Sequence, residues 1–375
     1  MQPLKGIRVL DFSTLLPGPL ATLILAEAGA EVIKIERPGR GDEMRSYEPR
    51  FGTDSVNFAL LNRGKRSIAI DLKAADAVGK LRPLIESADV VLEQFRPGVM
   101  DRLGLGYEAL KAMNPRLVYC ALTGYGQNGA RADLAAHDLN YVAESGLLAL
   151  TTGADGAPVL PAALVADIAG GTYPAVINIL LALRERDRTG LGLKLDIAMA
   201  ENLFTLMYWG IGNGLAAGRW PRPGGELVTG GSPRYNIYRT RDERFLAAAP
   251  LEQKFWESFC ALLEVPAELR DDRVDPAATH AEIAQRVKAR SADELRALFK
   301  GHDVCCAIMS TLQDALADPH FAARGVFDRK LAVGGERIGA LPVPVADAFR
   351  SDEREAGYPQ LGEANELLSP RGSAS

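Results

Sequence analysis

The chain has 375 residues, 47% of them hydrophobic and 24% charged, and its mild net charge of −5 without a basic stripe argues against a nucleic-acid partner. Four cysteines with no CxxC spacing and only four histidines argue against a zinc site and against a disulfide framework. The start has no apolar signal core and no uncharged run is long enough to span a bilayer, so we expect a cytoplasmic protein with no membrane partner.

Alternating strands and helices are predicted for the first half of the chain. An apolar run at 7–12 predicts a strand, and a turn at 15–19, a helix at 20–28 and a second strand at 31–36 follow it. This βαβ unit is of the kind that builds parallel sheets. The same alternation continues in three further strands and two helices, at 67–71, 90–93 and 117–123 and at 74–87 and 107–113.

The pattern changes after residue 220. A helix at 172–186, a strand at 193–197 and a helix at 201–216 come before a Gly- and Pro-rich hinge at 218–233. Beyond the hinge we predict a hairpin and three helices, at 235–238 with 245–249 and at 253–263, 281–289 and 292–300. The expected fold is α/β, with an open doubly wound parallel sheet in a large domain at 1–220, to which 330–375 returns, and a smaller α+β domain at 221–329. The polar tail at 363–375 is expected to fray.

The loops at the strand ends indicate the kind of ligand. Ligands of doubly wound sheets bind beyond the carboxyl ends of the strands, where this chain has Arg37-Pro38-Gly39, Asp71-Leu72-Lys73, Arg96-Pro97-Gly98 and a glycine-studded run at 124–129. Three of these loops supply a cation, so a phosphate-bearing ligand is the simple inference, although each cation alone could equally be a solvated loop charge. The GxGxxG fingerprint and the P-loop are both absent, which disfavours a dinucleotide enzyme and a P-loop kinase.

His137, Asp167 and Glu252 are the candidate catalytic residues. His137 follows the glycine-studded loop, Asp167 opens a long apolar helix that contains Gly170 and Gly171, and Glu252 lies in the second domain. Each has a structural reading as well: a hydrogen-bonded histidine, a helix N-cap and a helix-start carboxylate. The two glycines favour a ligand near Asp167, because glycine in a helix costs up to about 1 kcal/mol relative to alanine. A base and a carboxylate at one site would supply a proton shuttle, a nucleophile or both, and Glu252 could orient the histidine.

Segments over nearly the whole chain resemble the family III CoA-transferases, the CaiB/BaiF group. They are the segments 4–11, 17–19, 30–39, 62–67, 95–100, 124–127 and 188–190. The resemblance implies a coenzyme A thioester as the substrate, no permanently bound cofactor, and an interlocked homodimer.

The resemblance also implies which residues contact coenzyme A. The nucleotide end would meet the cations at the strand ends, and the pantetheine would lie nearer the glycine loop. The implied contacts are Arg37, Asp71, Leu72, Lys73, Arg96, Gly124, Tyr125, Gly126, Asn140 and Tyr141. These contacts agree with the phosphate-bearing ligand inferred from the loops.

The family holds two chemistries. In its transferases an aspartate attacks the donor thioester, and an anhydride and then an aspartyl-CoA thioester form. In its 2-methylacyl-CoA racemases a histidine and an aspartate flank the α-carbon and exchange its proton through an enolate. The segments around His137, Asp167 and Glu252 resemble the racemase branch most closely. We therefore expect proton exchange by His137 and Asp167 as a two-base pair, supported by Glu252.

Two alternatives stay open at this point. One is a transferase that moves coenzyme A between short acidic carboxylic acids through Asp167, with the acceptor acid as a second partner. The other is a coenzyme A thioester-binding protein without turnover. Two positions depart from the racemase pattern, since Ala136 stands where glycine is usual and Arg234 where an aromatic is common. Arg234 would suit a substrate that carries a carboxylate, or it is a surface cation.

Overall fold

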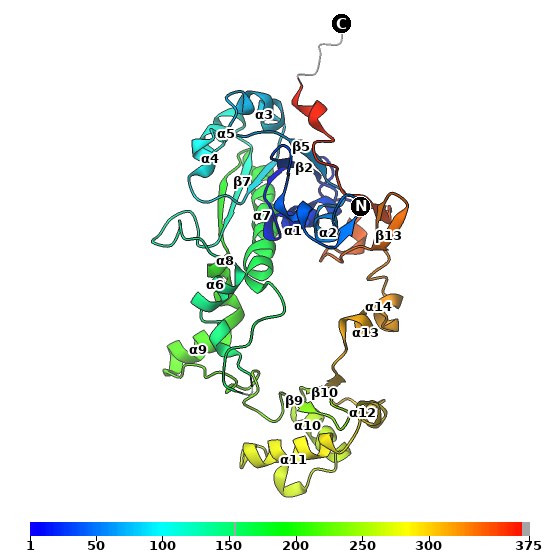
Figure 1. Cartoon of the computed structure of the whole chain (residues 1–375). Helices are drawn as coiled ribbons and strands as arrows, with labels where there is room; N and C mark the ends of the chain where they lie inside the picture. The colour runs from blue at the N-terminus through cyan, green and yellow to red at the C-terminus, as the bar shows by residue number, and fades with distance from the viewer. Residues whose placement is uncertain (154, 370–375) are drawn as a thin grey trace. The chain divides into compact units, whose positions relative to one another are not determined.

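The computed structural model describes residues 1–153 and 155–369. The chain divides into two compact units (Figure 1): the first comprises 1–145, 161–206 and the segment from Pro319 onward, and the second comprises 146–160 and 207–318. These bounds differ from the predicted domain limits, most clearly because 146–160 joins the second unit. The assignment of functional domains stays a prediction, and the two units are described one at a time.

A six-stranded parallel sheet forms the centre of the first unit. Its strand order is β5-β2-β1-β6-β7-β8, and each neighbouring pair is parallel. The strands are β1 Arg8–Phe12, β2 Glu31–Glu36, β5 Arg66–Ala69, β6 Val90–Glu93, β7 Val118–Thr123 and β8 Lys194–Ala198. The predicted open parallel sheet is thereby confirmed.

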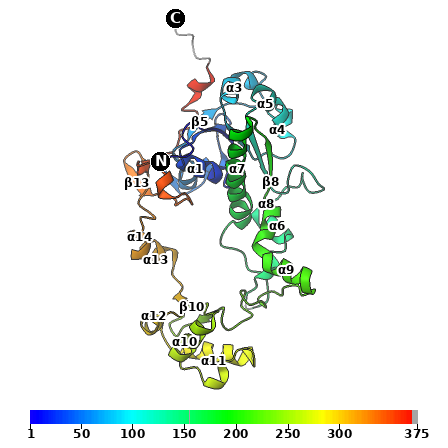
Figure 2. The ribbon, with the colours of Figure 1, turned by 180° about the vertical axis from the view of Figure 1, so that it is seen from behind.

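Helices flank this sheet, which explains its apolar strands. The helices of the first unit up to α7 are α1 Pro17–Glu27, α2 Val56–Asn62, α3 Ala77–Glu86, α4 Val99–Arg102, α5 Tyr107–Met113, α6 Asp138–Glu144 and α7 Tyr173–Thr189. Leu10 of β1 shares a buried core cluster with Leu81 of α3 and Leu110 of α5. Val9 is also fully buried and, by the alternation of a strand, points to the opposite face, on the side of α1 and α7 (Figure 2). A sheet that is covered on both faces needs apolar residues at successive positions.

The strand order reverses between β1 and β6. From β1 the sheet grows outward through β2 and β5, and the chain then crosses to β6 and continues through β7 and β8. Ligands of open parallel sheets bind at the carboxyl edge at such a switch point. The loop at 13–16 after β1 and the loop at 94–97 after β6 therefore mark the expected ligand site.

The C-terminal segment adds a small sheet to the first unit. After α14 (Pro319–Ala323), its strands are β12 Lys330–Val333, β13 Glu336–Gly339 and β14 Glu355–Ala356. Further on, Ala364 is buried in the core cluster of the parallel sheet, and Leu367 and Leu368 pack against that cluster. The expectation of a fraying tail is therefore wrong for 363–368, because apolar side chains in this polar segment cover the sheet. Residues 370–375 lie outside the described part of the chain.

The second unit is a small α+β body with its own core. Its main elements are α9 Tyr208–Ala217, β9 Asn236–Arg239, β10 Phe245–Ala248, α10 Gln253–Leu262, α11 Pro276–Lys288, α12 Ala292–Phe299, β11 Cys306–Ile308 and α13 Leu312–Leu316. The predicted hairpin is confirmed, since Leu246 pairs with Tyr238 in an antiparallel register. β11 adds a third strand to the hairpin, and its three residues are too few to show a strand pattern in the sequence.

One predicted helix, at 201–216, is interrupted. The structure has α8 (Met199–Asn202), a 3-10 turn at Leu203–Met207 and then α9. The Asn202 amide donates to the carbonyls of Gly170 and Ala198, at 2.8 and 3.1 Å. This tertiary contact stands at the point where the regular α-helix ends, and no helical periodicity in the sequence encodes it.

One helical stretch in the described residues is long and apolar enough to cross a membrane. It runs over Ala166–Thr189, and half of its most apolar window is buried inside the molecule. Length and composition alone are weak evidence of a span, because the core helix of a soluble protein has the same properties.

Candidate active site

A cavity of about 360 Å³, here called cavity A, lies in the first unit at the carboxyl ends of β1, β6 and β7. The loops after these three strands line it together with His137 and Asp167. The structure thus brings two of the three predicted catalytic residues to one cavity, at the switch point where the strand order places a ligand.

The segment around His137 is held by its own sequence. His137 is the residue before α6, and its backbone N–H donates to Asn140 Oδ1 at 3.0 Å. The Tyr141 hydroxyl donates to the Ala136 carbonyl at 2.9 Å. A Cβ on Gly124 would stand 2.4 Å from the Tyr141 ring, so only glycine lets that ring approach. Asn140 and Tyr141 line cavity A and at the same time fix the backbone that carries His137.

Asp167 lies in a π-helical turn, Ala166–Thr172, which leads into α7. The two glycines of this turn were expected to admit a ligand, and the structure corrects that interpretation. A Cβ on Gly170 would stand 2.3 Å from the Met199 carbonyl oxygen, and one on Gly171 would stand 2.9 Å from Met199 Cγ. The glycines are needed because α8 packs against this turn.

Asp138 is a member of the site that the sequence analysis missed. It is buried, and its Oδ1 accepts the Asp167 backbone N–H at 2.9 Å. Burial and the charge of Asp138 raise the pKa of Asp167 to about 6, although His137 acts in the opposite direction. A carboxylate with this pKa can take up and release a proton close to neutral pH. The position of Asp138 directly after His137 was the available signal.

Replacing Asp138 by asparagine should lower the pKa of Asp167 toward that of an ordinary aspartate. The amide oxygen can still accept the Asp167 N–H, whereas the like charge that disfavours ionisation is gone. An NMR titration of protein labelled with ¹³C at the aspartate carboxyls measures this pKa directly. Glu144→Gln, at the far end of α6, should leave it unchanged. An Asp167 pKa that stays near 6 in Asp138→Asn would mean that burial alone sets it.

A second cavity of about 400 Å³, here called cavity B, lies beside cavity A, because Phe95 lines both. Four of the predicted coenzyme A contacts line it: Arg37, Asp71, Leu72 and Lys73. Its wall combines apolar side chains, among them Ile35 and Ile70, with the cations Arg37 and Lys73 and with the acidic residues Glu36, Asp42, Glu43 and Asp71. The apolar part of this wall suits a flat aromatic base, and Arg37 and Lys73 are the groups in it that could contact phosphates.

The other predicted contacts fall into two groups. Arg96, Gly124 and Tyr125 line cavity A, so Arg96 does not lie with the cations of cavity B, with which it was grouped. Gly126 lines neither cavity. Its N–H donates to Thr123 Oγ1 at 3.0 Å, and its φ of +87° is a conformation that favours glycine.

Glu252 and Arg234 belong to the second unit. Glu252 is the residue before α10. Arg234 donates to Asp272 Oδ1 at 2.7 Å, and its guanidinium lies 4.8 Å from the centre of the Trp256 ring. Arg234 is thus part of this unit's own packing, and its contact with a substrate carboxylate stays a prediction, as does the role of Glu252.

The groups in cavity A can take part in proton transfer or nucleophilic attack, and cavity B beside it contains two cations, Arg37 and Lys73. His137 can act as a base, and Asp167 can act as a base or as a nucleophile. Among the described residues, no three or more His, Cys, Asp or Glu side chains are grouped so that they could hold a metal ion.

Comparisons with known proteins extend these observations. The model of CoA-transferase family III matches residues 4–365. The chain is 36% identical to alpha-methylacyl-CoA racemase of Homo sapiens, over 97% of this chain and 92% of the relative, and 34% identical to succinyl-CoA:glutarate CoA-transferase of Mus musculus, over 92% and 80%. A crystal structure of a CAIB/BAIF family protein from Brucella suis superposes with a TM-score of 0.82 at 32% identity, covering 98% of each chain. Racemases and transferases are therefore similar to this chain at nearly the same level.

Proposed function

Because this chain belongs to CoA-transferase family III, we propose that it is a 2-methylacyl-CoA racemase, which exchanges the α-proton of an acyl-coenzyme A thioester. The family assignment makes it an enzyme of the family III CoA-transferase superfamily. The observation that carries the finer proposal is that His137 and Asp167 line one cavity. Racemisation needs two proton-exchanging groups, whereas transfer needs only the carboxylate.

In the proposed reaction, His137 and Asp167 stand on opposite faces of the α-carbon. One of them removes the α-proton, an enolate forms, and the other returns a proton to the opposite face. The pKa of Asp167, raised to about 6, fits this role because the group then gains and loses a proton with little cost near neutral pH. The support of His137 by Glu252 is kept as a proposal that rests on the sequence pattern.

The two cavities suggest how the substrate is held. The nucleotide of coenzyme A is proposed to occupy cavity B, where Arg37 and Lys73 would meet its phosphates. The thioester would lie in cavity A beside His137 and Asp167, and the pantetheine would pass Phe95, which lines both cavities. No permanently bound cofactor takes part in this proposal.

The alternative within the family is coenzyme A transfer between short acidic carboxylic acids. Asp167 would then be the nucleophile and would form an anhydride and afterwards an aspartyl-CoA thioester. The similarity to succinyl-CoA:glutarate CoA-transferase at 34% identity favours it nearly as much as the racemase relatives favour the first proposal. A coenzyme A thioester-binding protein without turnover is the remaining alternative.

Deuterium uptake tests the proposal. A 2-methylacyl-CoA is incubated with the protein in D₂O, without an acceptor acid, and the label at the α-carbon is followed by mass spectrometry. Racemisation predicts uptake without any loss of the thioester. The protein is a transferase if 2-methylacyl-CoA thioesters of several acyl chain lengths take up no deuterium and succinyl-CoA with glutarate gives glutaryl-CoA.

The exposed face of α7 supports the proposed homodimer. Its apolar side chains Ile177, Leu180 and Leu181 are 56%, 43% and 63% exposed in the single chain. A row of exposed apolar side chains is typical of a surface that a partner covers in the assembled protein. Because the expected dimer is interlocked, a charge at this position should hinder its assembly, so we expect a lower dimer fraction for Leu181→Asp by light scattering, while Arg188→Gln at the end of the same helix stays fully dimeric. A wild-type protein that is a monomer, or that is soluble only in detergent, would contradict the dimer and favour a membrane-spanning role for this helix.

The cytoplasmic location stays a prediction.

A further inference from the structure

Residues 13–18, the loop after β1 and the start of α1, form a wall between the two cavities. Leu15 and Pro17 line cavity A, and Thr14 lines cavity B. Leu15 has a φ of +62°, a left-handed backbone conformation that residues with a side chain rarely adopt. Something must therefore hold this residue in place.

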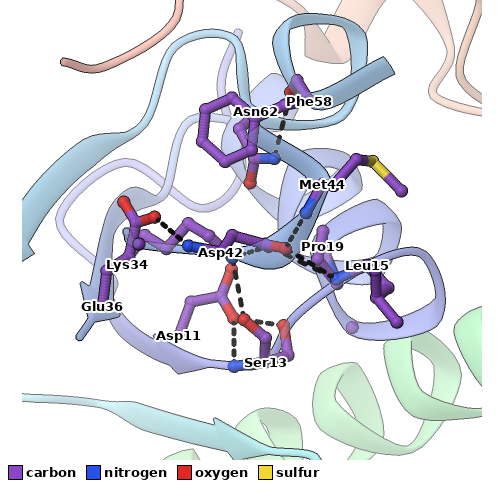
Figure 3. A network of polar contacts seen from close by, with 12 residues as sticks. Asp11, Ser13, Leu15, Pro19, Lys34, Glu36, Asp42, Met44, Phe58 and Asn62 are labelled. Carbon is purple, nitrogen blue, oxygen red and sulfur yellow. Dashed lines mark hydrogen bonds and ion pairs between the residues drawn. The ribbon is translucent and has the colours of Figure 1, made fainter. Parts of the chain in front are cut away.

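A buried ion pair holds the wall from the side of cavity B (Figure 3). Both oxygens of the Asp42 carboxylate accept the Leu15 N–H, at 3.2 and 3.3 Å, and one of them also contacts Lys34 Nζ at 2.9 Å. Lys34 Nζ in turn donates to the Ser13 carbonyl at 2.8 Å. Asp42 and Lys34 have no exposed side-chain surface, so water neither screens the attraction between their charges nor competes for their hydrogen bonds.

Two bonds hold the wall from the side of cavity A. The Gly18 N–H donates to Gln94 Oε1 at 3.1 Å, and the Thr172 hydroxyl donates to the Pro17 carbonyl at 2.8 Å. Thr172 belongs to the same π-helical turn as Asp167. A shift of the wall therefore reaches the turn that carries the catalytic carboxylate.

The loop that carries Asp42 also lines cavity B. Gly41, Asp42 and Glu43 line it together with Arg37, and the Arg37 Nε–H donates to the Gly41 carbonyl at 3.1 Å. The Asp42 N–H donates to Glu36 Oε2 at 2.8 Å, which anchors the loop to the end of β2. A ligand that contacts Arg37 thus restrains the same loop that fixes Leu15.

We propose that Asp42 is a positioning residue, which couples a nucleotide in cavity B to the placement of the Leu15–Pro17 wall of cavity A. The inference rests on the proposed function, since it assigns the two cavities to two parts of one acyl-coenzyme A. Its consequence is that the nucleotide contributes to kcat as well as to KM, because binding energy gained far from the reacting atoms is used to order the catalytic cavity.

Two thioesters with the same acyl chain test the coupling: the acyl-CoA and the acyl-pantetheine, which lacks the nucleotide. In the wild type, kcat for α-deuterium exchange should be at least about tenfold higher with the acyl-CoA. In Asp42→Asn, kcat with the acyl-CoA should fall to nearly the value for the acyl-pantetheine, which itself changes little. Asp54→Asn is the matched control, because the Asp54 carboxylate pairs with Arg45 in the same region and does not bond to residues 13–18.

Two outcomes would overturn the proposal. One is a wild-type kcat that does not depend on the nucleotide. The other is an equal fall of kcat with both substrates in Asp42→Asn, which a merely structural role predicts. If Asp42→Asn does not fold, Thr172→Val removes one of the two bonds on the side of cavity A and leaves the ion pair intact. It should lower the acyl-CoA to acyl-pantetheine ratio as well, and an unchanged ratio counts against the coupling.

A measurement without turnover separates this inference from the proposed reaction. Adenosine 3′,5′-bisphosphate, the nucleotide fragment of coenzyme A, should slow hydrogen exchange of the Leu15 amide in the wild type and in Asp54→Asn, and not in Asp42→Asn. This result would uphold the coupling even if no α-proton exchange is found. Binding of the fragment without any protection of Leu15 would refute the coupling and leave the racemase proposal untouched.

Discussion

Replacing either His137 or Asp167 by alanine should lower the rate of racemisation by about 10²- to 10⁴-fold, the usual contribution of a general acid or base. Both residues line cavity A, and a reaction that needs one base on each face of the α-carbon fails when either is lost. The assay follows conversion of one enantiomer of a 2-methylacyl-CoA into the other at saturating substrate, because the base that remains in each variant can still exchange the proton on its own face.

The two variants also separate the three functions. A transferase loses all turnover in Asp167→Ala but is only weakened in His137→Ala, because transfer has no evident use for the histidine. A binding protein keeps its affinity for the thioester in both variants and never turns it over. Leu134→Ala is the matched control, since Leu134 lines the same cavity and carries no titratable group. Near-wild-type racemisation by His137→Ala would contradict the two-base mechanism.

Replacing Glu27 by glutamine should destabilise the first unit by about 3–5 kcal/mol, the cost of removing one partner from a buried ion pair. Glu27 lies at the end of α1 and bonds Arg63 Nη2 at 2.8 Å and Arg350 Nη2 at 2.6 Å. The side chains of Glu27 and Arg350 are each 12% exposed and that of Arg63 is 2% exposed. Water can therefore solvate little of the arginine charge that loses its carboxylate partner. Because Arg350 belongs to the C-terminal segment, the variant should also loosen its attachment to α1.

The same carboxylate should contribute to acid sensitivity. Burial opposes ionisation of Glu27, but Arg63 and Arg350 outweigh it and lower the pKa of Glu27 below its ordinary value of 4.5. A carboxyl whose pKa is depressed in the folded state stabilises the protein above its unfolded pKa, and this stability is lost as pH falls through the folded pKa. Below pH 4.5 the difference between wild type and Glu27→Gln should therefore shrink.

Urea unfolding at pH 7 and at several values below pH 4.5 measures both effects. Glu31→Gln is the control, because Glu31 also pairs with two arginines, Arg8 and Arg66, but is 36% exposed. It should cost no more than about 1 kcal/mol, as surface pairs do. An equal loss of unfolding free energy in the two variants would show that burial does not strengthen the ion pairs of Glu27 with Arg63 and Arg350.

The sequence by itself determined the class of fold and the segments of the site. The strands β2 and β6 and the helix α5 have the bounds that their apolar patterns predict, because such patterns depend on neighbours within a few residues. The family resemblance likewise rests on local motifs, and the match over 4–365 confirms it. His137 and Asp167 could be singled out because each stands in such a motif.

Only the tertiary structure decided how these residues work together. That Asp138 raises the pKa of Asp167, that Met199 rather than a ligand requires Gly170, and that Asp42 holds Leu15 all depend on pairs brought together by the fold. The same is true of Arg96, which lines cavity A and not the slot with the other cations. The pKa of a side chain and the position of a cavity wall depend on burial and on groups from distant parts of the chain. A local sequence pattern therefore predicts neither of them.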